Sequence, residues 1–248
     1  MTISIITVCY NSEKTIQKTI ESVLSQTYPE IEYIIIDGKS TDKTLQLLSR
    51  YKNRISKIIS EKDNGIYDAL NKGITIAKGE IVGILHSDDY FSNELVISKI
   101  AEIFNKKKTD ALYSDLQYVS KDKPEKIIRN WVAGIFKKGI FKKGWMPPHP
   151  TFYVKRELFN KYGNYNTNFI FASDYELMLR FIHKHEIKLE YLPEVTVKMR
   201  VGGKGNVTFV NRIKANAEDK KAWLINQLSP PWLIRIKKPL FKLSQFWK

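Results

Sequence analysis

The fold of this chain is decided by the stretch Ile81-Val82-Gly83-Ile84-Leu85-His86-Ser87-Asp88-Asp89. Its apolar first half contains β-branched residues and predicts a short buried strand. The carboxylates of Asp88 and Asp89 follow where that strand should end, and ligands of open α/β sheets bind just beyond the carboxyl ends of the strands. Two adjacent carboxylates there can hold a divalent cation that binds a diphosphate. The alternative is a polar turn that closes the strand.

Strand-like and helix-like segments alternate on both sides of this stretch. In the first half we expect strands at 3–8, 32–36, 55–60 and 81–85, and helices at 13–25, 41–51 and 65–77. Beyond residue 93 we expect strands at 110–119, 126–132, 151–155 and 187–199, and helices at 94–106, 156–162, 173–185 and 208–228. This alternation is typical of βαβ units. It predicts an α/β fold with a mostly parallel central sheet flanked by helices.

The composition is that of a globular protein, because 43% of the 248 residues are hydrophobic and 12% are aromatic. The single cysteine, Cys9, excludes an internal disulfide and a cysteine metal cluster. No run of eighteen apolar residues occurs, so we expect no membrane-spanning helix. The chain begins with strand-like residues rather than a signal peptide, which predicts a cytoplasmic protein.

The net charge of +15 predicts an anionic partner, such as nucleic acid, an anionic membrane surface or a phosphorylated substrate. Eight Lys or Arg residues stand against two acids in 121–145, and five stand against none in 232–248. The segment 232–248 also contains aromatic residues, as interfacial helices do. We therefore expect it to contact an anionic membrane, with packing on its own domain as the alternative.

Two further groups of polar residues in the first half are candidates for nucleotide contacts. Asp37 ends the second expected strand beside Gly38, where a carboxylate can accept hydrogen bonds from a base or a ribose. Asp68, Asn71 and Lys72 lie at i, i+3 and i+4 of an expected helix and so share one face. That face can meet a nucleotide, or Asp68 and Lys72 can simply form an exposed ion pair.

The second half carries three weaker signals. Asp174 opens an expected helix, where it can cap the helix or act as a general base, and capping is the commoner role for local sequence of this kind. His149 lies between two prolines, and the four histidines lack metal-ligand spacing, so it is either structural or an acceptor contact. Arg200 and Lys204 lie in a Gly-rich loop that lacks the P-loop pattern but can close over phosphates.

Taken in order, these motifs resemble the family 2 glycosyltransferases with the GT-A fold, most closely those that act on bacterial surface polysaccharides. The resemblance is specific over about the first 90 residues and thinner to about residue 205. The matching segments include Ile5-Ile6-Thr7-Val8-Cys9-Tyr10-Asn11, Ile36-Asp37-Gly38-Lys39-Ser40-Thr41-Asp42, Asp63-Asn64-Gly65-Ile66-Tyr67-Asp68, Ser87-Asp88-Asp89, Pro148-His149-Pro150-Thr151 and Ser173-Asp174-Tyr175-Glu176.

The resemblance implies roles for these residues. Asp174 matches the catalytic base, and Asp89 matches the ligand of a Mg²⁺ or Mn²⁺ cofactor. Ser87 stands where the family's motif often has another carboxylate. The residues expected to hold the donor are Thr7, Tyr10, Asn11, Asp37 (on the base), Asp68, Asn71, Lys72, Asp88 (near the ribose), Arg200 and Lys204. Those expected to contact the acceptor are Trp145, His149 and Glu176.

The implied activity is inverting transfer of a sugar from a nucleotide-sugar donor, expected to be a UDP-sugar, to a hydroxyl of a glycan or lipid-linked glycan. We expect a domain at 1–205, with a donor half at 1–92 and an acceptor half at 93–205. A C-terminal helix and basic tail at 206–248 would place the enzyme at the inner face of the cytoplasmic membrane. The alternatives are a nucleotide-sugar-binding protein without catalysis and a basic nucleic-acid-binding protein. No RRM, KH or helix-turn-helix pattern favours the last, and we expect no nucleic-acid partner.

Overall fold

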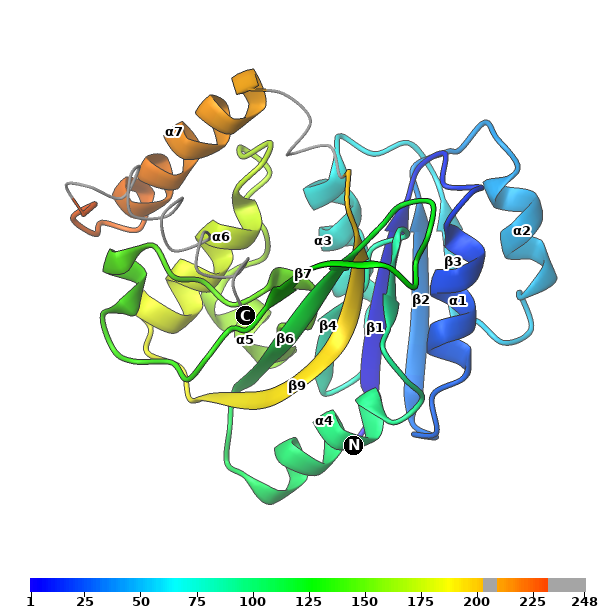
Figure 1. Ribbon diagram of the computed structural model, residues 1–248, viewed down its shortest axis with the longest axis horizontal. Helices are drawn as coiled ribbons and strands as arrows, with labels where there is room; N and C mark the ends of the chain where they lie inside the picture. Colours follow the sequence, from blue (N-terminus) through cyan, green and yellow to red (C-terminus); the bar gives the residue numbers. More distant parts are fainter. Residues whose placement is uncertain (203–208, 232–248) are drawn as a thin grey trace.

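The computed structural model of the protein describes residues 1–202 and 209–231. In this part of the chain one curved sheet of nine strands is flanked by helices (Figure 1). The strands are β1 Ile3–Cys9, β2 Ile31–Asp37, β3 Lys57–Ser60, β4 Ile81–Ile84, β5 Asp89–Phe91, β6 Ala111–Val119, β7 Ile127–Trp131, β8 Tyr153–Lys155 and β9 Leu189–Arg200. The helices are α1 Ile16–Leu24, α2 Thr44–Arg50, α3 Ile66–Ile76, α4 Val96–Lys106, α5 Glu157–Tyr162, α6 Ser173–Met178 and α7 Phe209–Ile225.

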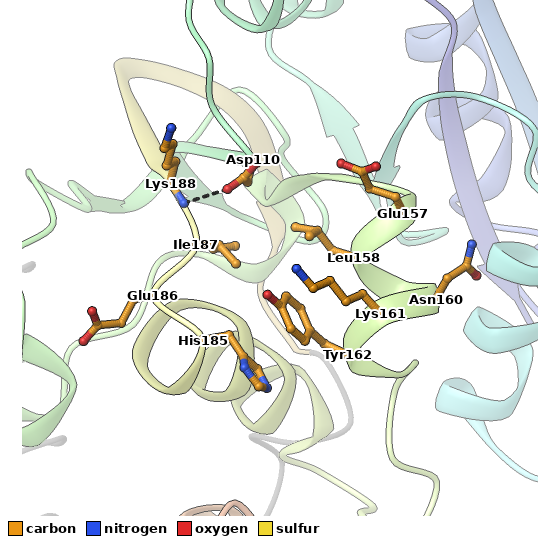
Figure 2. Close-up of a pocket in the computed structure, with 10 residues that line it drawn as sticks. All are labelled: Asp110, Glu157, Leu158, Asn160, Lys161, Tyr162, His185, Glu186, Ile187 and Lys188. Atoms are coloured by element: carbon orange, nitrogen blue, oxygen red, sulfur yellow. Dashed lines mark hydrogen bonds between the residues drawn. The ribbon is translucent and has the colours of Figure 1, made fainter.

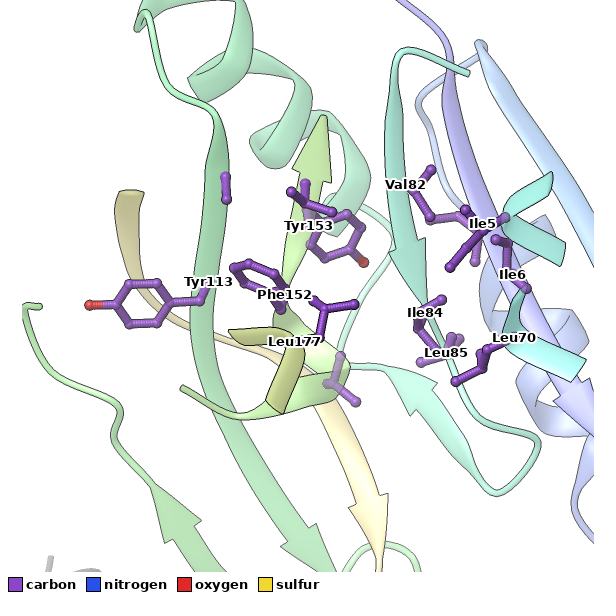
Figure 3. Packing of buried hydrophobic residues seen from close by; sticks show 14 of the residues in the cluster. Ile5, Ile6, Leu70, Val82, Ile84, Leu85, Tyr113, Phe152, Tyr153 and Leu177 are labelled. Atoms are coloured by element: carbon purple, nitrogen blue, oxygen red, sulfur yellow. The ribbon is translucent and has the colours of Figure 1, made fainter. Parts of the chain in front are cut away.

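The first half of the sheet is parallel, in the order β3-β2-β1-β4. All seven residues of β1 are buried, as the continuous apolar run of a strand covered on both faces predicts. Helix α3 packs closely on this strand, because a Cβ atom at Gly73 would lie 2.5 Å from Ile6 Cγ2. Figure 3 shows Leu70 of the same helix beside Ile6 and Leu85 in the core.

The second half of the sheet is mixed. β8 runs antiparallel between β4 and β6, β6 pairs in parallel with β9, and β5 and β7 pair antiparallel with β9 and β6. Gly83 permits the junction of the halves, since a Cβ atom there would lie 2.2 Å from Tyr153 Cε1. The α/β fold class is therefore confirmed, with the parallel pairing concentrated in the first half.

Two elements differ from the expectation. The three residues of β5 form a strand where none was expected between 81–85 and 110–119. The helix expected at 173–185 begins as α6 but continues over Leu179–Lys184 as a π-helix. Helix α7 packs on α6, and its Trp223 is 1% exposed. None of the helices in the described ranges is long and apolar enough to cross a bilayer. Lys204 and the segment 232–248 lie outside the described residues.

Candidate active site

The end of β2 is a closed polar turn built on Asp37. This carboxylate is fully buried, and its Oδ1 accepts hydrogen bonds from Ser40 Oγ at 2.5 Å and from Cys9 Sγ at 3.6 Å. Its Oδ2 accepts from Ser40 N at 3.0 Å and from Ser60 Oγ at 2.7 Å. Asp37 therefore ties three strand ends together and presents no surface to a nucleotide base, contrary to the role expected for it.

Of the three residues at or just after β1 that are expected to hold the donor, one is buried and two are exposed. Thr7 is fully buried, and its Oγ1 lies 3.2 Å from Tyr33 Oη. Asn11 has a left-handed backbone (φ 50°), and its Oδ1 accepts a hydrogen bond from Thr41 N at 2.8 Å. Tyr10 is 54% exposed. Asn11 is exposed as well, so Tyr10 and Asn11 can reach a ligand there and Thr7 cannot.

The polar face of α3 is engaged within the protein. Asn71 Nδ2 donates to the carbonyl of Tyr165 at 2.8 Å, and Tyr165 N donates back to Asn71 Oδ1 at 3.0 Å. Lys72 Nζ lies 2.9 Å from Glu61 Oε1 and 3.6 Å from Asp68 Oδ2. The ion-pair interpretation of Asp68 and Lys72 therefore describes this face, and Asn71 fastens a loop of the second half to it.

Asp89 is the opposite of Asp37. It is fully buried, yet neither of its carboxylate oxygens has a hydrogen-bond partner among the described residues. Burial, followed by the neighbouring Asp88, raises the pKa of Asp89 well above its usual range, while Arg200 opposes the shift. Burial also raises the pKa of Asp88, against the effects of Arg200 and His149. An unpartnered buried carboxylate is costly, so this pair fits a bound cation.

Helix α1 and the loop after β1 hold the turn Ser87-Asp88-Asp89, which we call the acidic turn. Thr19 Oγ1 donates to the carbonyl of Ser87 at 3.0 Å and to that of Asp89 at 2.7 Å. The hydroxyls of Ser12 and Ser87 lie 2.9 Å apart. Ser87 thus replaces a potential third carboxylate with a hydroxyl that fastens the turn to the end of β1.

Strand β9 fixes the same turn from the other side. Because Asp89 pairs with Met199, the next residue, Arg200, reaches the carbonyl of Asp88, to which Nη1 donates at 2.5 Å. Arg200 is 6% exposed, and its guanidinium also lies 5.1 Å from the ring centroid of Tyr90. This residue, expected to hold the donor, therefore supports the acidic turn instead of reaching outward.

Asp174 lies in the first turn of α6 and makes no capping hydrogen bond there. Its Oδ2 lies 3.2 Å from His149 Nδ1, and Tyr67 Oη donates to its Oδ1 over a long 3.5 Å. Burial, together with Asp174, raises the pKa of Tyr67, so this hydroxyl keeps its proton. The side chains of Asp174 and His149 are 19% and 26% exposed. The carboxylate is thus held in place but open to solvent, as a general base requires.

His86 connects the acidic turn with Asp174. Its ring centroid lies 5.4 Å from that of His149, and its carbonyl accepts a hydrogen bond from Asp89 N at 3.0 Å. Burial, followed by His149, lowers the pKa of His86 to about 3, so its ring is neutral. Asp89, Asp88, His149 and Asp174 therefore form one contiguous site at the edge of the sheet where β4 ends.

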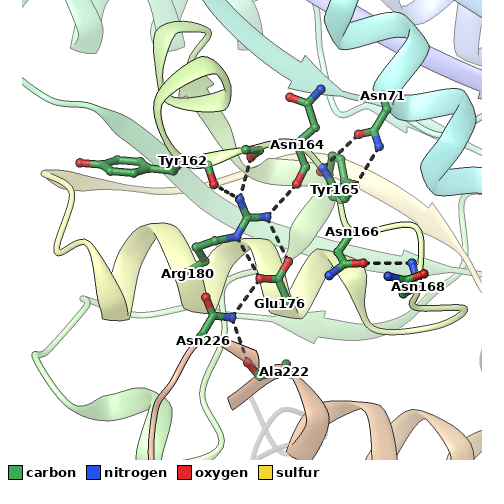
Figure 4. Close-up of polar contacts among 11 residues, drawn as sticks. Asn71, Tyr162, Asn164, Tyr165, Asn166, Asn168, Glu176, Arg180, Ala222 and Asn226 are labelled. Carbon is green, nitrogen blue, oxygen red and sulfur yellow. Dashed lines mark hydrogen bonds and ion pairs between the residues drawn. The ribbon is translucent and has the colours of Figure 1, made fainter. Parts of the chain in front are cut away.

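Trp145 and Glu176 do not line this site, and the structure corrects their expected acceptor role. Trp145 is 1% exposed, and its Nε1 donates to the carbonyl of Ala133 at 2.7 Å. Glu176 is 2% exposed, and Figure 4 shows it between Arg180 and Asn226. Arg180 Nε lies 2.9 Å from its Oε1, and the same atom accepts from Asn226 Nδ2 at 2.9 Å. Both side chains hold the fold behind the site.

Three residues near the site were missed by the sequence reasoning. Tyr67 stacks on Tyr165 at 5.7 Å and so holds its hydroxyl toward Asp174. Tyr118 pairs with Met199, the residue of β9 that lies opposite Asp89, and burial raises the pKa of Tyr118 while Arg129 opposes the shift. Tyr67 stands in the quoted motif that begins at Asp63, whereas no local pattern marks Tyr118.

The third is Asp63, which follows β3 in the motif that begins at Asp63-Asn64-Gly65. A Cβ atom at Gly38 would lie 2.5 Å from Asp63 Oδ2 and 3.5 Å from Tyr10 Cδ2. Gly38 therefore lets this carboxylate approach the backbone closely just after β2, beside the exposed ring of Tyr10. Its place in a quoted motif was the one signal that could have identified it.

A hollow of about 600 Å³ lies elsewhere, and Figure 2 shows residues from α5 and from the segment before β9 around it. Asp110 and Lys188, which line it, precede β6 and β9, so the hollow lies at the edge where β4 begins. None of the residues expected to bind donor, acceptor or metal lines it.

The comparisons with known proteins agree with this architecture. The model of the Glycosyl transferase family 2 matches residues 4–176. An uncharacterized glycosyltransferase of Mycobacterium tuberculosis is 33% identical over 182 residues, which are 72% of this chain and 68% of that protein. An Escherichia coli UDP-Glc:alpha-D-GlcNAc-diphosphoundecaprenol beta-1,3-glucosyltransferase is 39% identical over 125 residues, 48% of this chain and 47% of that enzyme.

Two solved structures share the fold at low sequence identity. TarS of S. aureus in complex with UDP-GlcNAc superimposes with a TM-score of 0.69 and 19% identity, over all of this chain and 72% of that one. The mannosyltransferase PcManGT of Pyrobaculum calidifontis, in complex with GDP-Man and Mn²⁺, gives a TM-score of 0.66 and 18% identity, over 99% of this chain and 71% of that one.

Proposed function

The chain belongs to glycosyl transferase family 2, and from this premise we propose that it transfers a sugar, with inversion, from a UDP-sugar to a hydroxyl of a glycan or lipid-linked glycan in surface-polysaccharide synthesis. The observation that carries the proposal is the pairing of two unlike carboxylates at one sheet edge. Asp89 is buried without a partner, and Asp174 is open and held by His149. Asp89 is suited to hold a cation, and Asp174 is suited to accept a proton.

Mg²⁺ or Mn²⁺ would be held by Asp89, with Asp88 beside it. The two unpartnered oxygens of Asp89 support this assignment, since a cation would satisfy both and reverse the raised pKa. The described residues contain no cluster of three or more metal-binding side chains, so further ligands would come from the donor's phosphates and from water. When bound, such a cation stabilises the negative charge of a departing diphosphate.

Asp174 would take the proton of the acceptor hydroxyl as that oxygen attacks the anomeric carbon. His149 and Tyr67 keep its carboxylate from rotating toward the backbone of α6. His149 therefore acts on the base in this proposal, and its exposed edge remains available to the acceptor. Tyr10 and Asp63 would contact the nucleoside, because both lie beside Gly38 just after β2 and Tyr10 is exposed there.

The proposed substrates follow from the chemistry of relatives. The E. coli relative uses UDP-Glc and a diphosphoundecaprenol-linked acceptor, and the S. aureus structure holds UDP-GlcNAc. We propose a donor half at 1–92 and an acceptor half at 93–205. A lipid-linked acceptor would suit peripheral binding at the inner face of the cytoplasmic membrane through 232–248, which lies outside the described residues.

A panel of UDP-, GDP- and dTDP-sugars, each with and without Mn²⁺, tests the proposal by thermal stabilisation of the full chain. We expect one nucleotide class to raise the melting temperature only when Mn²⁺ is present. Transfer is then assayed with that donor and with lipid-diphosphate-linked saccharide acceptors. Stabilisation by none of the donors, with or without metal, would overturn the proposal.

A further inference from the structure

Three backbone amides that precede α6 share one acceptor from the far end of the chain. The carboxylate of Glu218 on α7 accepts hydrogen bonds from the N–H groups of Ile170, Phe171 and Ala172, at 2.9, 2.8 and 2.9 Å. Ala172 is the N-cap residue of α6, and Ile170 and Phe171 precede it, so these three amides belong to the segment that leads into the helix and have no acceptor within its hydrogen-bond ladder. Their acceptor comes from a residue 46 positions after Ala172, on another helix.

Helix α7 also holds the residues that follow Asp174. Trp223 Nε1 donates to Tyr175 Oη at 2.8 Å, and Asn226 Nδ2 donates to Glu176 Oε1 at 2.9 Å. Figure 4 shows Asn226 and Ala222 beside Glu176. The contacts of α7 and the turn after it therefore lie on both sides of Asp174 along the chain, while the Asp174 carboxylate itself faces His149 and Tyr67.

We infer that α7 is a positioning element for the base, and that Glu218 is the positioning residue through which it sets the place of Asp174. Helix α6 and the π-helix that continues it form one short helical segment over 173–184, and a helix of this length is marginally stable without outside contacts. The preceding Ile170 is 70% exposed and has little packing to fix it. The anionic Glu218 supplies both the missing acceptors and a charge suited to a helix start. The inference rests on the proposed function, because it needs Asp174 to be the base.

The consequence is that the active site extends beyond the segment that the family model matches, residues 4–176. Small displacements of a reacting group cost rate out of proportion to stability. Loss of the Glu218 contacts should therefore lower turnover while the donor, held at the ends of β1 to β4, binds as before.

The test compares Glu218→Ala and Glu218→Gln with Lys220→Gln, a control at an exposed residue of the same helix. We expect Glu218→Ala to lower kcat about 10–100-fold with an unchanged donor dissociation constant. Glu218→Gln, which keeps one acceptor oxygen, should fall between it and the wild type, and Lys220→Gln should match the wild type. Amide hydrogen exchange at 170–172 should be faster in Glu218→Ala.

The outcomes separate the two claims. A wild-type kcat in Glu218→Ala, or unchanged exchange at 170–172, overturns the inference while leaving the transferase in place. A parallel loss of donor binding and kcat would assign Glu218 to general stability and would also overturn it. If the wild type transfers no sugar, the proposed function fails, and faster exchange in Glu218→Ala would then leave Glu218 as a cap without a catalytic role.

Discussion

Asp37 and Asp89 follow the same kind of apolar strand and are both fully buried, but their surroundings are opposite. Asp37 accepts four hydrogen bonds from Cys9, Ser40 and Ser60. Asp89 accepts none from the described residues. The difference shows that an aspartate at a strand end has two uses. A carboxylate surrounded by donors closes the turn, whereas one left without donors is prepared for a ligand that brings positive charge.

The largest effect is expected for Asp174→Asn, in the candidate site that also contains Asp89. Removing the proton acceptor should lower kcat about 10²–10⁴-fold and leave the donor affinity unchanged, because the amide keeps the shape of the side chain. Single-turnover transfer and donor titration on the same preparation measure both quantities. Near-normal transfer would remove Asp174 from the role of base.

The comparison itself is tested by the matched pair Asp37→Asn and Asp89→Asn. Asp37→Asn places an NH₂ group against donors that need an acceptor, so we expect it to lower the free energy of unfolding by about 1–3 kcal/mol. Asp89→Asn removes a buried carboxylate without donors and should leave stability unchanged or raise it. Urea unfolding of the metal-free protein measures both. Equal destabilisation by the two variants would erase the distinction between the two strand ends.

The cation itself provides the next test. In the wild type, Mn²⁺ with UDP at about 100 times the dissociation constant should stabilise the fold by about 2.7 kcal/mol, a shift of about 5–10 °C in Tm. In Asp89→Asn the Mn²⁺-dependent part of that shift should disappear, and chelation should abolish it in the wild type. A full shift in Asp89→Asn would place the cation elsewhere.

The smallest expected effect is the contribution of His183, which lies away from both strand ends, to the pH dependence of stability. Burial, and then Lys142, lowers the pKa of His183, opposed by Glu186 and reinforced by Lys138, and its ring lies 5.1 Å from that of Trp223. As pH falls below the ordinary imidazole value of about 6.5, the unfolded chain binds the proton more readily, so stability is lost. His86, whose pKa burial lowers to about 3, causes a loss of stability in the same range, so His183→Gln should reduce but not abolish the difference in the free energy of unfolding between pH 7 and pH 5, measured by urea unfolding. If the free energy of unfolding of His183→Gln changed between pH 7 and pH 5 as much as that of the wild type, His183 would not contribute to the pH dependence.

Most of the fold could be predicted because the first half obeys local rules. The run at 81–85 and the alternation around it correctly gave β1, β2, β3, β4 and the helices between them. The three residues of β5 are too few to show a period, and their strand exists only because β9 pairs with them. The π-helix after Met178 likewise has no local signal.

The candidate site was predictable in its carboxylates and less so in its supporting residues. Asp88, Asp89 and Asp174 stand in motifs, and the structure places them at one edge of the sheet, where their roles stay predictions. Trp145 and Glu176 were assigned to the acceptor on the family resemblance, which says nothing of their burial. Their true partners, the Ala133 carbonyl and Arg180, appear only once the chain is folded.

The contacts between Glu218 and residues far earlier in the sequence also have a consequence for the order in which the chain folds during synthesis. Synthesis proceeds from the N-terminus, and a nascent chain that has emerged as far as β9 already contains Asp88, Asp89, His149 and Asp174. It lacks the carboxylate that fastens the three amides before α6, because Glu218 follows later. A nascent chain that stops before Glu218 therefore carries these acidic residues without the contacts that fasten the segment before α6.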